Sequence, residues 1–257
     1  MTSIDLHHFA DIGVRRRREA SCTSALTPSR LPGLEHALNP YRGCAHGCVY
    51  CYAPALTHIP WEQWTDALPK RGLLRLLAKE LRSAEGVIGV GTATDPYQPL
   101  EASTGLTRNC LELISRSRAS ACVHTKSDLV LRDLDLLRSM EAGVTVTTLD
   151  DTVSRALEPG APMPRRRLRA LQGLVSSGVD AFAMVGPALS CLEGRERELM
   201  EAIAATGVPT VMVDPLNLRP DRRSELNGLD LRPASDAVIA VLKREASTLG
   251  MECRDAF

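Results

Sequence analysis

A chain of 257 residues with 31 basic and 31 acidic residues has a formal net charge of zero, and so lacks the excess positive charge of a surface dedicated to duplex nucleic acid. Its hydrophobic content of 44% supports a sizeable core, while no apolar run approaches the ~20 residues of a membrane span. Residues 1–30 carry no apolar stretch of the kind found in secretory signals. Because a chain of this size does not need disulfide staples, its eight cysteines fit a reducing compartment, and we expect a cytoplasmic protein without membrane contact.

Residues 1–34 show no sustained hydrophobic periodicity and include a basic run from Arg15 to Arg18. We expect a weakly structured N-terminal arm here, with an arm that binds nucleic acid or a protein partner as the alternative. The remaining residues, 35–257, are expected to form one domain.

From residue 35 onward, short apolar runs alternate with longer segments whose apolar residues repeat at helical spacing. The short runs predict buried strands at 36–41, 86–91, 121–125, 144–148, 180–186 and 209–214. The longer segments, several of which end in glycine, predict helices at 69–84, 104–118, 131–143, 165–178, 194–207 and 234–250.

Strands that alternate with helices at this spacing predict βαβ units and an α/β fold with a parallel sheet. Six such units are too few for the eight of a closed (β/α)8 barrel. They fit either a partial (β/α)6 TIM-type barrel or an open doubly wound sheet. No Gly-x-Gly-x-x-Gly segment follows a predicted strand, which disfavours a dinucleotide-binding sheet.

Three of the eight cysteines stand close together in NPYRGCAHGCVYCY, residues 39–52, where Cys44, Cys48 and Cys51 have the spacing C-x3-C-x2-C. A structural zinc site usually takes four ligands as two separated pairs; the other cysteines form no second pair, although His46 is a candidate fourth ligand. A cubane iron–sulfur cluster normally takes four thiolates, so three on one loop leave one iron open for a ligand that is not protein. A cluster, a zinc site and a set of free cysteines all stay open at this point.

The cysteine spacing, with the aromatic residue Tyr50 directly before the third cysteine, resembles the signature of the radical S-adenosylmethionine (SAM) superfamily. The resemblance implies that Cys44, Cys48 and Cys51 hold a [4Fe–4S] cluster whose open iron binds the amino and carboxylate groups of SAM. It further implies reductive cleavage of SAM to a 5′-deoxyadenosyl radical that abstracts hydrogen, with an electron donor such as flavodoxin or ferredoxin. Since the loop follows the first predicted strand, we expect the cluster at the C-terminal mouth of the sheet.

Four further segments occur in an order that resembles the spore photoproduct lyase-like subgroup of this superfamily. They are GTATDPYQPLE (91–101), TKSDLVLRD (125–133), VTVTTLDD (144–151) and LEPGAPMPRRRLRAL (157–171). This resemblance covers residues 36 to about 190 and favours the partial (β/α)6 barrel over the doubly wound sheet. Glu158 and Arg167 match positions of the subgroup, without an assigned role.

The resemblance also implies a set of cofactor contacts. Tyr50 would pack against the adenine of SAM, and polar contacts to SAM would come from Thr94, Asp95, Lys126 and Thr145. SAM carries a carboxylate and a ribose, which an ammonium and hydroxyl groups suit.

The polar residues of this set have simpler structural explanations as well, which stay open. Thr94 and Asp95 precede Pro96, and Asp-Pro commonly opens a turn. Lys126 is also a candidate surface lysine, and Thr145 an ordinary strand residue.

The chain departs from the lyase in its hydrogen relay. The lyase returns a hydrogen atom from a cysteine at the position of Thr92, and an O–H bond is much too strong to replace a thiol in that role. Two tyrosines that the lyase ties to this relay have counterparts in Tyr50 and Tyr52, and Tyr97 is a further candidate for lining the site; we expect catalytic roles for these three.

We therefore predict a radical SAM enzyme that acts on an unidentified small-molecule, peptide or nucleic-acid substrate. A DNA pyrimidine-dimer lyase is the alternative enzyme. A non-enzymatic zinc-binding or redox-sensing protein is the alternative from another class.

Overall fold

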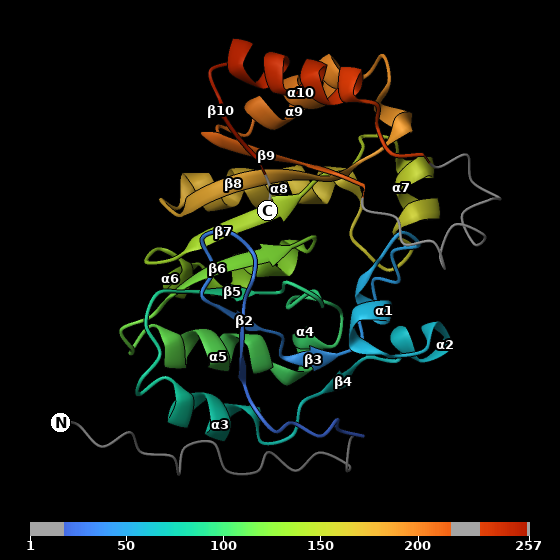
Figure 1. Cartoon of the computed structure of the whole chain (residues 1–257). Coiled ribbons are helices and arrows are strands. Elements are labelled where there is room, and N and C mark those ends of the chain that lie inside the picture. Colours follow the sequence, from blue (N-terminus) through green and yellow to red (C-terminus); the bar gives the residue numbers. More distant parts are fainter. Residues whose placement is uncertain (1–17, 217–231, 256–257) are drawn as a thin grey trace.

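The computed structural model describes residues 18–216 and 232–255. An eight-stranded sheet runs through the molecule in the order β1-β2-β5-β6-β7-β8-β9-β10 (Figure 1). Its strands are Leu26–Pro28 (β1), His36–Leu38 (β2), Val87–Val90 (β5), Ser120–Thr125 (β6), Glu141–Thr145 (β7), Asp180–Ala188 (β8), Thr210–Pro215 (β9) and Glu252–Asp255 (β10). β1 is antiparallel to β2, and every other neighbouring pair is parallel.

The strand order confirms the predicted α/β fold and distinguishes between the two predicted architectures. β2, β5, β6, β7, β8 and β9 correspond to the six predicted strands, and they neighbour one another in strict chain order. A doubly wound sheet reverses its order at a switch point, which this sheet does not do. Within the described residues the edge strands β1 and β10 do not pair with each other, so the sheet is an open, partial TIM-type barrel rather than a closed one.

Helices follow the parallel strands and cover the sheet. α3 and α5 lie toward the β2–β5 end in Figure 1, α8 lies along β7 and β8, and α9 and α10 lie beside β9 and β10. The longer helices are Leu73–Glu80 (α3), Leu106–Ile114 (α5), Asp151–Leu157 (α7), Pro164–Ser176 (α8), Glu196–Ala204 (α9) and Asp236–Thr248 (α10). The short elements are Ala53–Thr57 (α1), Trp61–Trp64 (α2), Glu101–Thr104 (α4), Leu134–Leu137 (α6), the 3-10 turns Asp128–Asp133 (η2) and Ser190–Leu192 (η3), and the paired strands Tyr41–Arg42 (β3) and Leu68–Pro69 (β4). No helix in these ranges is long and apolar enough to cross a bilayer.

Alternate residues of the strands face opposite sides of the sheet, as strand geometry requires. On β8, Ala181 and Ala183 belong to the main core beneath the helices. Phe182, which stands between them, packs instead with Leu34 and Cys122 on the inner side of the sheet.

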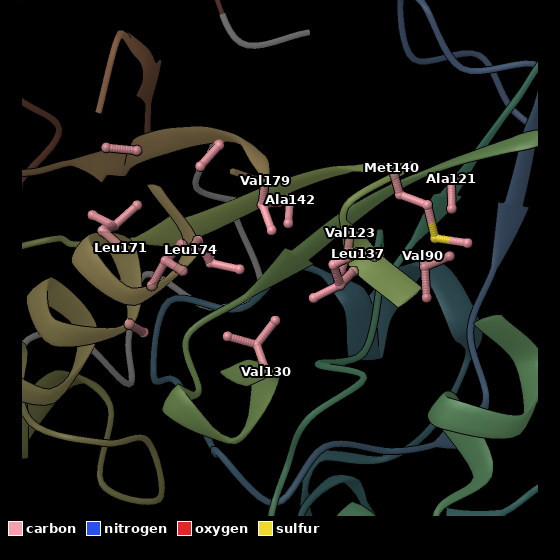
Figure 2. Packing of buried hydrophobic residues seen from close by; sticks show 14 of the residues in the cluster. Val90, Ala121, Val123, Val130, Leu137, Met140, Ala142, Leu171, Leu174 and Val179 are labelled. Carbon is pink, nitrogen blue, oxygen red and sulfur yellow. The ribbon is translucent and has the colours of Figure 1, made fainter. Parts of the chain in front are cut away.

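The main core lies between the sheet and its helices. Figure 2 shows Val123 of β6 and Ala142 of β7 in this core, together with Leu137 of α6 and Leu171 and Leu174 of α8. All five side chains are at most 1% exposed. The core holds the strand ends in a fixed register, on which the loops that follow them depend.

Two short strands of the eight-stranded sheet were not predicted. β1 lies inside the segment expected to be a weakly structured arm, where the Glu80 carboxylate accepts hydrogen bonds from the amides of Ala25 and Leu26. β10 extends the parallel sheet beyond β9. Residues 1–17 of the arm, with most of its basic run, lie outside the described residues, and the domain boundary at residue 34 stays a prediction.

The prediction of a helix over 131–143 and a strand over 144–148 was wrong by several residues. The helical part ends at Leu137, and β7 runs from Glu141 to Thr145. Glutamate, alanine and glycine are poor strand formers, which hid the start of this strand. Packing explains the glycine: a Cβ atom at Gly143 would lie 2.1 Å from the ring of Phe182.

We expect Gly143→Ala to lower the free energy of unfolding by about 1–3 kcal/mol, because the added methyl group overpacks the inner side of the sheet. Urea unfolding of the purified chain measures this loss. A variant as stable as the wild type would contradict the packing described for Gly143 and Phe182.

Candidate active site

A cavity opens at the carboxyl edge of the sheet, and residues at or after the ends of all six central parallel strands line it. This is the edge at which α/β proteins build their ligand sites. Its polar and sulfur-bearing lining residues are Cys44, His46, Cys48, Tyr50, Cys51 and Tyr52 after β2, Thr92 and Asp95 after β5, His124, Thr125 and Lys126 at the end of β6, Thr145 of β7, Met184 of β8 and Asp214 of β9.

The three cysteines of the C-x3-C-x2-C loop all reach this cavity, and none of them is recorded in a disulfide. Burial raises the pKa of Cys44 to about 12 and raises the pKa of Cys48 as well, so the thiolate forms need a positive partner such as a metal. Among the described residues no three His, Cys, Asp or Glu side chains converge closely enough for one metal ion. The nature of the metal group therefore rests on family membership, given below.

The cysteine loop is fixed by backbone contacts with the turn after α7. The amide of Gly160 donates to the carbonyl of His46 at 2.9 Å, and the amide of Val49 donates to the carbonyl of Leu157 at 2.9 Å. A Cβ atom at Gly160 would lie 2.0 Å from the carbonyl oxygen of Ala45. Only glycine allows the loop to lie this close.

Asp95 joins three loops through its buried carboxylate. Its oxygens accept from the Thr125 hydroxyl and the Lys126 amide at 2.7 Å each and from the Tyr97 amide at 2.9 Å, and His46 Nδ1 lies 3.3 Å away. Burial opposes ionisation, but His46 and these hydrogen bonds outweigh it and lower the pKa of Asp95 to about 2. The Asp95 carboxylate thus has protein partners at the cavity wall, and the direct SAM contact expected of it stays a prediction.

Glu158, which the sequence left without a role, is the centre of a second buried network. Its carboxylate lies 2.5 Å from Arg167 Nη1 and 3.7 Å from Lys126 Nζ, and it accepts hydrogen bonds from the hydroxyls of Tyr50 and, at 3.1 Å, Thr147. Burial acts against the carboxylate, but Arg167 and Lys126 lower the pKa of Glu158 below its usual range. Two cations therefore share the Glu158 carboxylate, and Lys126 is the one of the two that borders the cavity.

Lys126 presents that positive charge to the cavity. Burial alone would lower the pKa of Lys126, but the Glu158 carboxylate outweighs it and raises the pKa. Its Nζ atom also lies 5.9 Å from the centroid of the Tyr50 ring, within the range of a cation–π contact. A lysine held in this way suits a ligand carboxylate.

The other predicted site residues divide into two groups. Tyr52, with 41% of its surface exposed, and Thr145 both line the cavity. Thr94 does not line it; its hydroxyl donates to a backbone carbonyl of β3 at 3.5 Å. Tyr97 is also placed away from the cavity, where its hydroxyl donates to Asp133 at 3.0 Å.

Sequence reasoning missed two ionisable residues of the cavity. Asp214 stands near the end of β9, where burial raises its pKa to about 6. Its position at the end of a predicted strand was the sequence signal that could have identified it as a site residue. His124 stands near the end of β6, where burial lowers its pKa to about 4.

The sequence profile of the Radical SAM superfamily matches residues 38–190, which is more than half of the chain. The chain belongs to the radical SAM superfamily. Among curated relatives, an uncharacterized protein of Methanocaldococcus jannaschii is 33% identical over 63% of this chain and 63% of its own length. An uncharacterized protein of Mycobacterium tuberculosis is 30% identical over 80% of this chain and 66% of its own length. The chain therefore spans less than two thirds of the length of these relatives.

Solved structures agree on the fold. Spore photoproduct lyase complexed with dinucleoside spore photoproduct has a TM-score of 0.73 and 16% identity, covering 95% of this chain and 81% of the lyase chain. Streptococcus suis SuiB bound to S-adenosylmethionine has a TM-score of 0.59 and 11% identity, covering 86% of this chain and 50% of its own. At these identities the likeness establishes the fold, and it confirms the resemblance to the lyase-like subgroup at that level.

A radical SAM protein implies a [4Fe–4S] cluster and SAM, and the residues of this cavity fit both. Three thiols with raised pKa values for Cys44 and Cys48 lie on one glycine-held loop. Nε2 of His46, beside them, is buried without a hydrogen-bond partner. Lys126 brings an ammonium group, which suits a ligand carboxylate, to the same cavity.

We expect Gly160→Ala to weaken metal binding, because the new methyl group must displace the carbonyl of Ala45 and with it the cysteine loop. Iron bound per chain after anaerobic reconstitution measures the effect. Gly143→Ala is the matched control: it introduces a similar clash away from the loop and should lose about 1–3 kcal/mol of stability while keeping its iron. Equal iron in both variants would contradict a special role for Gly160.

We expect Asp214→Asn to stabilise the metal-free fold at neutral pH but not in acid. A folded-state pKa of about 6 against a usual value of 3.8 means that the fold favours the protonated carboxyl group. The stability that this group contributes is present below its unfolded pKa and is lost as pH rises through about 6. The stability difference between variant and wild type in urea unfolding should therefore grow from acid to neutral pH; parallel pH profiles would contradict the burial of this carboxylate.

Proposed function

We propose that this chain is a radical SAM enzyme that cleaves SAM reductively and abstracts a hydrogen atom from an unidentified substrate. The observation that carries the proposal is the meeting of three cysteine side chains with the Lys126–Glu158–Arg167 network at one cavity. When bound, a [4Fe–4S] cluster supplies the electron that splits SAM into methionine and a 5′-deoxyadenosyl radical.

The chain's own residues bind and orient the reactants. Cys44, Cys48 and Cys51 would hold three irons and leave the fourth for SAM. Lys126, oriented by Glu158, would bind the SAM carboxylate, and Thr145 offers a hydroxyl on the same wall.

The two tyrosines of the loop are suited to different tasks. The Tyr50 hydroxyl donates to Glu158 inside the protein, and burial holds the pKa of Tyr50 well above its usual value. We therefore assign Tyr50 to orienting Glu158 and bordering the cofactor. Tyr52 is exposed at the cavity and is the better placed of the two for hydrogen transfer with substrate. Tyr97 is left out of the reaction because its hydroxyl is engaged with Asp133.

The second candidate function is lyase action on a pyrimidine dimer in DNA, supported by the fold shared with spore photoproduct lyase over 95% of this chain. Against it stands Thr92, which lines the cavity and whose hydroxyl accepts from Asn39 at 3.2 Å. The cavity lining among the described residues offers no thiol beyond the three of the cluster loop. A small molecule, a peptide or a nucleic acid therefore stays within the proposal as substrate.

The remaining partners follow from the chemistry. The reaction needs one electron from a low-potential donor such as flavodoxin or ferredoxin. None of the eight cysteines is recorded in a disulfide, which suits a reducing cytoplasm. A zinc or redox-sensing role without catalysis would leave the Lys126–Glu158–Arg167 network without a ligand to serve.

We expect the anaerobically reconstituted chain to release 5′-deoxyadenosine when given dithionite and SAM. The Cys44→Ala variant should release none, and Lys126→Met should weaken SAM binding about 10- to 100-fold, since it loses one charge-assisted hydrogen bond. Lys79→Met, at an exposed lysine on α3, is the matched control and should bind SAM as the wild type does. Chromatography with mass spectrometry measures the product.

A chain that binds the cluster and SAM but never cleaves SAM would overturn the proposal, and tightly bound zinc without iron or sulfide would favour the metal-binding alternative. Dinucleoside spore photoproduct is the substrate arm of the same experiment. Release of two thymidines would favour the lyase, and 5′-deoxyadenosine without thymidine would favour another substrate.

A further inference from the structure

Asp214, near the end of β9, is a carboxylate of the cavity wall that no protein group pairs with. The other aspartate of the wall, Asp95, is engaged by His46 and by the loop after β6. In the part of the chain that the structure describes, no hydrogen bond or ion pair reaches Asp214, and burial alone raises its pKa. A partly buried carboxylate is costly to ionise without an opposite charge beside it, so Asp214 favours a positively charged ligand.

Strand alternation places the Asp214 side chain on the inner side of the sheet. Val211 and Val213 of β9 belong to the main core beneath the helices. Met212, which stands between them, packs instead against the cluster around Phe182 on the inner side. Because Asp214 comes two residues after Met212 on the same strand, it faces the same inner side, nearer the carboxyl edge.

Beside Asp214 the cavity wall is apolar, and a glycine keeps it open. A Cβ atom at Gly186 of β8 would lie 3.3 Å from Cβ of Asp214 and 3.0 Å from Cε of Met184. Met184 and Leu31 line the cavity and pack against the cluster around Phe182. This part of the wall therefore combines an apolar surface with one carboxylate, which suits an apolar stem that ends in a cationic nitrogen.

The protein itself does not supply the missing positive charge. Among the described residues that line the cavity, Lys126 is the one lysine, and there is no arginine. The Nζ atom of Lys126 lies 3.7 Å from the Glu158 carboxylate, which is its partner. The cation that pairs with Asp214 must therefore come with a ligand.

We propose that Asp214 determines the specificity of the substrate site by binding an ammonium or guanidinium group that an apolar stem carries. A free amine and the side chain of a lysine or arginine in a peptide share this chemistry. The inference rests on the proposed function, since it names the class of substrate on which that reaction acts. The anionic backbone of a nucleic acid does not suit this wall.

The test measures binding to the full chain, reconstituted anaerobically with its cluster and loaded with SAM, without reductant. Calorimetry is carried out at mildly alkaline pH, above the pKa of about 6 of Asp214. The probes are n-pentylamine, n-pentanol, which has the same stem without the charge, and Nα-acetyl-lysine N-methylamide, which carries the amine on a peptide backbone.

We expect at least one of the two amines to bind about 10-fold more tightly than n-pentanol, because the ammonium group forms a charge-assisted hydrogen bond with Asp214. Asp214→Asn, which we expect to fold stably, should lose this preference and bind n-pentanol as the wild type does. Asp236→Asn, at an exposed aspartate in the first turn of α10, is the matched control and should keep the preference.

A wild type that binds no probe or does not prefer an amine, or a preference that survives in Asp214→Asn, would overturn the inference. An equal loss of SAM affinity in Asp214→Asn would also overturn it, because Asp214 would then serve the cofactor. Tighter binding of n-pentylamine supports the inference with a free amine as the source, and tighter binding of the lysine probe supports it with a peptide side chain. Failure of the proposed function is distinct, because the wild type would then lack an iron–sulfur cluster or fail to release 5′-deoxyadenosine with dithionite and SAM.

Discussion

A single buried carboxylate, that of Glu158, is the constraint on which the rest of the site depends. A fully buried charge is costly unless opposite charges and hydrogen bonds surround it. Glu158 gathers them from separate parts of the chain: Tyr50 from the cysteine loop, Lys126 from the end of β6, Thr147 from the turn after β7 and Arg167 from α8. Satisfying this one group therefore brings the cysteine loop against the strand ends and holds the ammonium group of Lys126 at the cavity.

Asp95 completes the arrangement on the other side of the cysteine loop. It binds the loops after β5 and β6 together and orients His46, while Gly160 lets the loop approach the turn after α7. The two carboxylates act in the same way, since each one fixes the position of a neighbouring side chain that borders the cavity. Asp95 fixes His46 beside the thiols, and Glu158 fixes Lys126 beside the cavity. The cysteine loop and Lys126, the proposed SAM contact, are thus parts of one hydrogen-bonded structure.

The six central strands and the cluster of three thiols could be predicted from the sequence, because hydrophobic periodicity and close cysteine spacing are local signals. The start of β7 could not be predicted, because Gly143 is explained only by its contact with the ring of Phe182 on the next strand. The sequence also did not separate Thr94 and Tyr97, which follow a strand end but turn into the protein, from Lys126, which faces the cavity. Position after a strand end predicts which loop a residue occupies; its partner, often far away in the chain, decides the direction of its side chain.

The central claim is that the thiols and the Lys126 network form one site, in which SAM binds directly to the cluster. Electron–nuclear double resonance on the reduced, reconstituted chain tests this most directly, with SAM labelled by 15N at its amino group and by 17O at its carboxylate. The account predicts that both labels couple to the electron spin of the cluster. SAM that binds without coupling through either label would contradict it.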